Sequence, residues 1–229
     1  NQNLNSVLPS LISSDKASHV SYHWDFPDPS DEFWLYNIPE NRYRIEDVYG
    51  ITGVPSCFVN GNFWNGNSAS LTTAIINEAG EAPSPLAITI AETSDADSAT
   101  ITVTVEALGA VDVSNLRLHV AVIEEFVGPK PATPNGETEW HDVMRDMVTG
   151  EQGDNIGALA KGDVITRTYK YPYDDANVQA SETRTLAFVQ DPATNKVFQS
   201  LLGDQETGSN QTTNNVRVGQ LSTSVETAA

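Results

Sequence analysis

Residues 49–61 read YGITGVPSCFVNG, and this stretch decides how the first third of the chain is interpreted. Gly50 ends a helical pattern, and the Gly53-Val54-Pro55 tripeptide that follows predicts a turn. A short apolar run typical of a strand comes next, and Asn60-Gly61 is the dipeptide that tight hairpins favour. The stretch therefore predicts a helix end, a turn, a strand and a hairpin in succession.

The hydrophobic pattern on either side of this stretch predicts the neighbouring elements. A helix over 4–12 places its apolar residues on one stripe, and Pro9 predicts a kink or break within it. Alternation over 19–24 predicts a strand, and Pro39 lies in the first turn of a second helix that ends at Gly50. After a hairpin over 58–64, Ser68 is suited to cap a third helix. The predicted order is helix, strand, helix, hairpin, helix.

The pattern changes from helical to alternating after Ala82-Pro83-Ser84-Pro85, where we predict a domain boundary. Short runs rich in Val, Ile and Thr, separated by Asp, Gly and Pro, are typical of an antiparallel sandwich. We therefore predict one domain over 1–82, a sandwich over 83–203 and a polar tail over 204–229. The strands predicted for the sandwich cover 86–91, 100–105, 116–123, 164–171, 185–189 and 197–201.

Composition excludes several classes of function. The chain has 12 Lys and Arg against 31 Asp and Glu, a net charge of −19, which repels nucleic acids and anionic membrane surfaces. No apolar run approaches the roughly 20 residues that span a bilayer. The one cysteine, Cys57, rules out a dithiol or a zinc motif of the Cys-x-x-Cys type within this sequence. Because the sequence starts at Asn1 without a leader, we expect a mature or truncated product.

Several spaced motifs together resemble one protein family. They are Ser21–Pro27, Asn41–Arg44, Gly53-Val54-Pro55, Leu118–Glu124, Asn135–Thr138, His141–Arg145 and Leu186–Asp191. This set is similar to the twenty-eight-kilodalton outer membrane protein family of surface and secreted bacterial proteins. The resemblance covers most of residues 1–203 and implies an extracytoplasmic location. It also implies an α/β plus all-β fold, in which a thioredoxin-like domain precedes an immunoglobulin-like sandwich.

The resemblance implies a strand and a Cys-x-x-C pair before the helix at 4–12, and this sequence has neither. A sheet without that strand would leave backbone groups unpaired, so we expect another strand to fill the slot. The sources we consider are a retained upstream peptide, an upstream segment outside this sequence, or a strand from another copy. The hypothesis we develop is donation by the tail, whose alternating run carries Val216, Val218, Leu221 and Val225.

The candidate binding residues lie near the predicted turn and in an aromatic loop. By resemblance we predict a cis Val54–Pro55 bond that either presents backbone to a peptide or simply fixes the turn. Trp24, Phe26 and Trp34 belong to an aromatic cluster, with Phe33 and Tyr36, that forms either a peptide or glycan platform or part of the core. Cys57 is interpreted as a buried small hydrophobe instead of a nucleophile.

Metal and acid–base sites are alternatives that we do not favour. His19, His23 and Asp25 are competent ligands, and calcium is the one cofactor we consider, at Asp25, Asp28, Asp31 and Glu32 or at Asp95 and Asp97. No EF-hand spacing accompanies them, so we expect solvated acidic loops and no metal. His141, Asp142 and Glu137 lack a nucleophile partner, and we expect a structural histidine there.

These observations lead to a non-catalytic surface or secreted protein with a structural, assembly or binding role. We expect its partners to be other copies of itself or a strand donor, with a peptide or glycan as a further ligand. The alternative is a thiol–disulfide oxidoreductase whose Cys-x-x-C segment lies upstream of Asn1.

Overall fold

The computed structural model describes residues 2–13, 16–131, 136–174, 176–203, 212–217 and 223–228. Its helical segments are short, and all but the turn at Ala180–Glu182 lie in about the first third of the chain. None of the helices in these ranges has the length and hydropathy needed to cross a bilayer. The helical segments are α1 (Gln2–Val7), α2 (Pro9–Ile12), α3 (Glu32–Tyr36), α4 (Ile38–Arg42), the π-helical η1 (Tyr43–Val48), the 3-10 turns η2 (Ser68–Ser70) and η3 (Ala180–Glu182), and α5 (Thr73–Ala79).

The helix starts and breaks follow from particular residues. Pro9 has no backbone N–H, and it begins α2 directly after the break at Leu8, as the sequence predicts. The predicted third helix begins later than expected, because Ser68 opens only the short turn η2. Thr72 caps α5 instead, and its side chain accepts a hydrogen bond from the Ile75 N–H at 3.3 Å.

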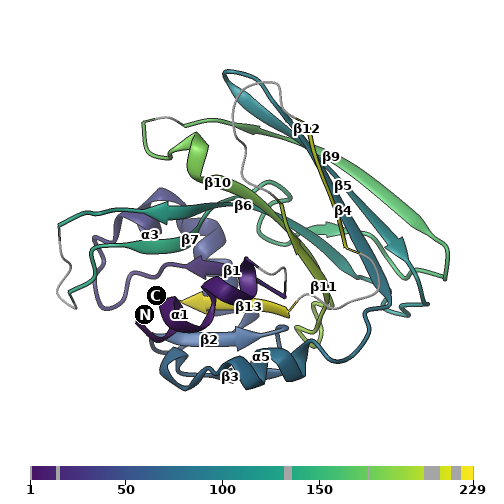
Figure 1. Ribbon diagram of the computed structural model, residues 1–229, viewed down its shortest axis with the longest axis horizontal. Helices are drawn as coiled ribbons and strands as arrows, with labels where there is room; N and C mark the ends of the chain where they lie inside the picture. Colours follow the sequence, from purple (N-terminus) through teal and green to yellow (C-terminus); the bar gives the residue numbers. More distant parts are fainter. Residues whose placement is uncertain are drawn as a thin grey trace.

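Within the described residues, the strands form a nine-stranded sheet, here called the long sheet, and a four-stranded sheet, called the short sheet (Figure 1). The long sheet has the order β11-β10-β6-β7-β1-β13-β2-β3, with β8 paired to β6, and the short sheet has the order β12-β4-β5-β9. The strands are β1 (Ala17–Tyr22), β2 (Ser56–Val59), β3 (Trp64–Gly66), β4 (Leu86–Ser94), β5 (Ser98–Ala107), β6 (Arg117–Val127), β7 (Trp140–Met147), β8 (Asp154–Asn155), β9 (Val164–Pro172), β10 (Thr183–Gln190), β11 (Val197–Leu202), β12 (Thr212–Arg217) and β13 (Thr223–Ala228).

The short sheet packs against the β6, β10 and β11 part of the long sheet. Alternate residues of the facing strands form one apolar cluster, in which Ile88 and Val103 of the short sheet join Leu118 and Val189 of the long sheet. All six strands predicted for the sandwich are present, with ends that coincide with the predicted bounds or differ from them by up to four residues. The sequence did not predict β7 or β12.

The long sheet continues from the sandwich into the helix-bearing first third of the chain. β1 pairs with β7 in parallel through Ser21 and Val143. The second faces of β6 and β10 pack against β1 and η1, in a cluster that includes Tyr22, Ile45 and Phe188. Because β6 and β10 are covered on both faces, nearly every residue along them is buried.

Candidate functional site

The candidate site begins with the strand that completes the long sheet. β13 lies between β1 and β2, parallel to the first and antiparallel to the second (Figure 1). All six of its residues have register partners in Ala17–Tyr22, and four of them also pair with Ser56–Val59. β13 therefore uses both edges of a slot that the strands of the first third leave between them.

The surroundings of this slot explain why it needs a strand. Every residue of β1 is buried, and Cys57 and Val59 of β2 have no exposed surface. Apolar residues of α1, α2 and α5 cover this part of the sheet, in a cluster with Leu8, Leu71 and Ile76. Each unpaired backbone group in such a place costs about 1–3 kcal/mol, so the slot has to be filled in the folded state.

The expected occupant requires two corrections. The run from Val216 to Val225 is not one strand, because Val216 lies in β12, at the edge of the short sheet, and Val225 lies in β13. Val218 and Leu221 lie outside the described residues. The structure also fills the slot with β13 of the same chain, so completing the sheet requires no second copy.

The predicted turn forms a corner next to this sheet. The Val54–Pro55 bond is cis, as expected. Val54 and Trp24 both pack against the cluster that contains Tyr22 and Ile45. The ring of Phe26 lies 5.9 Å from that of Trp24, and Phe26 is 54% exposed. Val54 and Trp24 therefore pack against the same cluster, and the exposed ring of Phe26 lies next to Trp24.

Trp34 does not join this corner. It is 4% exposed in α3, and the Arg42 guanidinium lies 5.7 Å from its ring. Phe33 is also buried, packed against Trp140 of β7 with ring centroids 5.4 Å apart. Phe33 and Trp34 of the aromatic cluster are therefore part of the core, whereas Phe26 lies on the surface.

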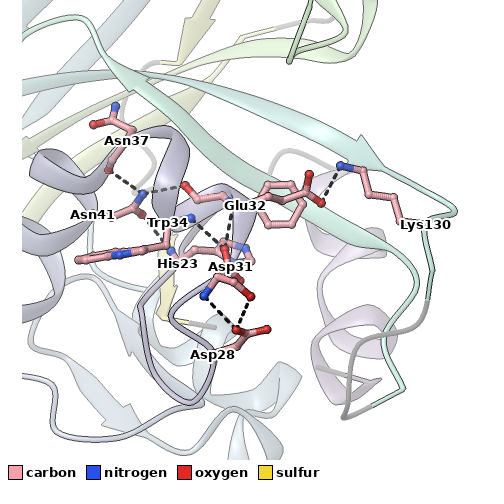
Figure 2. Close-up of polar contacts among 10 residues, drawn as sticks. His23, Asp28, Asp31, Glu32, Trp34, Asn37, Asn41 and Lys130 are labelled. Carbon is pink, nitrogen blue, oxygen red and sulfur yellow. Dashed lines mark hydrogen bonds and ion pairs between the residues drawn. The ribbon is translucent and has the colours of Figure 1, made fainter.

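The carboxylates considered for calcium mostly satisfy neighbouring groups (Figure 2). Asp31 accepts hydrogen bonds from the Phe33 and Trp34 N–H groups and lies 3.0 Å from His23 Nδ1. Burial raises the pKa of Asp31, but these hydrogen bonds outweigh burial, and the pKa is lowered overall. Asp28 accepts from the Ser30 N–H and hydroxyl. The described residues contain no group of three or more side chains suited to hold a metal ion.

His19 and His141 are distant in the sequence but line the same region of the structure. His19 Nδ1 lies 2.8 Å from Asp142 Oδ2, and both side chains are buried. His141, the neighbour of Asp142, packs against Phe126. The sequence separates His19 and Asp142 by more than 120 positions, so only the pairing of β1 with β7 brings them together.

The family described as outer membrane protein Omp28 matches residues 42–205. HBP35 of Porphyromonas gingivalis is 18% identical with a TM-score of 0.59, and the match covers 80% of this chain and 63% of that one. A domain of the outer membrane lipoprotein Omp28 from the same organism is 18% identical with a TM-score of 0.38, covering 56% and 92%. This chain therefore spans less than two thirds of HBP35, and the similarity to HBP35 concerns the fold. No curated protein matches the chain.

Proposed function

Because this chain belongs to the Omp28 outer membrane protein family, we propose that it is a non-catalytic surface or secreted protein with a structural or binding role. Family membership gives it an extracytoplasmic, outer membrane-associated location. The scaffold we propose is a thioredoxin-like unit over 1–82 joined to an immunoglobulin-like sandwich over 83–203. The order of elements and the cis Val54–Pro55 corner support the first unit, and the two facing sheets support the second.

The observation that carries this proposal is the position of β13. It enters the sheet through backbone pairing on both edges, which is how an added strand is recognised. Cys57, the sole thiol of the chain, is fully buried beside it and is not placed to act as a nucleophile. A strand slot without an accessible thiol favours a structural or binding role over a redox role.

Removing the strand tests the proposal. We expect a chain that ends at residue 222 to lose several kcal/mol of the about 5–15 kcal/mol that stabilises a domain, measured by urea unfolding. A synthetic peptide of residues 222–229 should restore the midpoint, whereas a scrambled peptide should not. An unchanged midpoint after truncation would contradict the proposal.

Exchange of this strand between copies is the second candidate role. The same register pairs form when β13 of one copy enters the slot of another, so exchange gains and loses no backbone pairing. Light scattering of the full chain across a range of concentrations distinguishes the two arrangements. An average molecular mass that rises with concentration for the full chain, but not for the chain that ends at residue 222, supports exchange. A constant monomer mass rejects it.

Thiol–disulfide exchange, with a Cys-x-x-C segment upstream of Asn1, is the alternative function. The Gly53-Val54-Pro55 turn before β2 is the observation that favours it, since the fold we propose has this turn beside its redox site. Reduction of insulin disulfides by the protein isolated from its membrane tests this alternative. Turnover in that assay would overturn the non-catalytic assignment, and its absence would uphold it.

A further inference from the structure

A pocket of about 420 Å³ lies between the N-terminal helices and the ends of β6 and β7. Its volume falls within the roughly 300–1,000 Å³ typical of sites for small molecules. Neither Val54 nor Pro55 of the proline corner is among the described residues that line it. The pocket shares Leu8 and β1 with the surroundings of the strand slot, and its other walls come from β6, β7 and β10.

One side of the pocket is apolar. Leu4 and Leu8 of α1 and the turn after it line this side together with Ile12 of α2. Trp140, at the start of β7, adds an aromatic ring that is partly exposed. These side chains provide a surface for the hydrocarbon or aromatic body of a ligand.

The polar side is dominated by carboxylates. The described lining residues include one guanidinium, that of Arg184, and four carboxylates, those of Glu125, Glu137, Glu139 and Asp142. The lining also includes the imidazoles of His19 and His141. The balance of fixed charge in the pocket is therefore negative.

The Arg184 guanidinium and the His19 imidazole already have partners. Arg184 Nε donates to the Gly203 carbonyl at 2.7 Å, and its Nη1 lies 3.5 Å from Glu125 Oε1. His19 is hydrogen-bonded to Asp142. An anionic ligand would have to compete with these internal acceptors for the guanidinium and would meet the remaining carboxylates. The pocket is thus unsuited to an anion.

The second carboxylate oxygen of Glu125 points to a donor. Its Oε2 atom is buried and has no hydrogen-bond partner among the described residues. Buried polar atoms in folded proteins nearly always have a partner, and this one is closed off from solvent, so a ligand N–H can reach it only when the Glu125 side chain rotates toward the pocket. A cation near the ring of Trp140 gains a further attraction from the face of the indole.

We infer that this pocket binds a small organic cation: a protonated amine or amidine attached to an aliphatic or aromatic body. The charged head lies among the carboxylates of Glu125, Glu137 and Glu139, and the body packs against Leu4, Leu8 and Trp140. This site adjoins the strand slot through β1 and Leu8, and binding of a small cation there goes beyond the proposed function.

Three probes of similar size and different charge test the inference by calorimetry on the full chain. They are 2-phenylethylammonium, neutral 3-phenylpropan-1-ol and anionic 3-phenylpropionate. We expect the amine to bind at least tenfold more tightly than the alcohol, and the acid to show no binding. Equal affinity for all three probes, or no amine binding at millimolar concentration, would overturn the inference.

Paired variants locate the binding. Glu137→Gln with Glu139→Gln removes two carboxylates at the mouth, and we expect it to weaken amine binding about tenfold while alcohol binding stays the same. Glu81→Gln with Glu106→Gln makes the same change in net charge at exposed positions outside the pocket and should leave both affinities unchanged. Equal weakening by the two pairs would mean that the amine responds only to the overall charge, and would overturn the assigned site.

Discussion

His19 Nδ1 lies 2.8 Å from Asp142 Oδ2, and this hydrogen bond ties β1 to β7 where the first third of the chain joins the sandwich. Asp142 has a φ of +53°, a backbone conformation that Asp and Asn tolerate better than most residues. We expect Asp142→Ala to lower the free energy of unfolding by about 1.5–3 kcal/mol, because it leaves the buried imidazole without this acceptor. Asp142→Asn keeps an acceptor and the backbone preference, and should cost clearly less. Equal losses for both variants in urea unfolding would contradict this role.

A buried ion pair joins β6 to β7 and positions a guanidinium against two rings of α3. Arg145 Nε donates to Glu124 Oε2 at 2.7 Å, and the guanidinium lies between the rings of Phe33 and Tyr36. We expect Glu124→Ala to cost about 3–5 kcal/mol, because it leaves a buried cation uncompensated. Glu32→Ala breaks the exposed pair with Lys130 and is the matched control, with an expected change below about 1 kcal/mol. Similar losses of unfolding free energy for Glu124→Ala and Glu32→Ala would contradict the difference expected between the buried and the exposed ion pair.

Glu40 makes stability depend on pH near neutrality. Burial raises its pKa to about 7, Asp146 and Glu151 act in the same direction, and the hydrogen bonds from the Met147 N–H and Asn37 amide oppose the rise. The ordinary value is 4.5, so between these values the folded state binds more protons than the unfolded state. The free energy of unfolding must therefore fall as pH rises through this window.

Glu40→Gln removes this titration and preserves an acceptor for the Met147 N–H and the Asn37 amide. We expect the variant to be more stable than the parent by about 1–2 kcal/mol at pH 8, after allowing for partial solvent exposure, and to show no advantage at pH 4. Thermal unfolding of both proteins from pH 4 to 8 gives the comparison. Parallel stability curves would show that Glu40 does not titrate in this range.

Local signals in the sequence predicted many of the elements. Pro9 marks the break between α1 and α2, and the Asn60-Gly61 turn, with φ of +47° and +74°, joins β2 to β3. Each of these features is determined by the backbone conformations that one or two residues can adopt. The sandwich strands were equally visible, because each has apolar or aromatic residues at alternate positions, Val, Ile and Leu on β4 and β5 and Ile and Tyr on β9.

The missed features depend on partners that are distant in the sequence. β7 contains Asp142 and Arg145, which interrupt any apolar alternation, and both are buried only because His19 and Glu124 meet them there. The pocket was missed for the same reason, since its walls come from the N-terminal helices, β1, β6, β7 and β10. The tail was expected to enter the open slot of another copy, whereas the structure places β13 in the slot of its own chain. The polar composition of the tail gave no indication that β12 and β13 would pair with different sheets.

The position of β13 is the central claim, and one substitution tests it directly. Thr227 of β13 is the register partner of Cys57 in β2. Opposed residues of antiparallel strands have Cα atoms about 4.5–5.5 Å apart, a separation that a disulfide spans. The variant Thr227→Cys, oxidised mildly and analysed by non-reducing electrophoresis and peptide mass mapping, should form a 57–227 disulfide, whereas Thr223→Cys, a control outside the β2 pairing, should not. A linked monomer is the predicted result, a linked dimer would assign the strand to another copy, and free thiols in both variants would contradict the placement of β13.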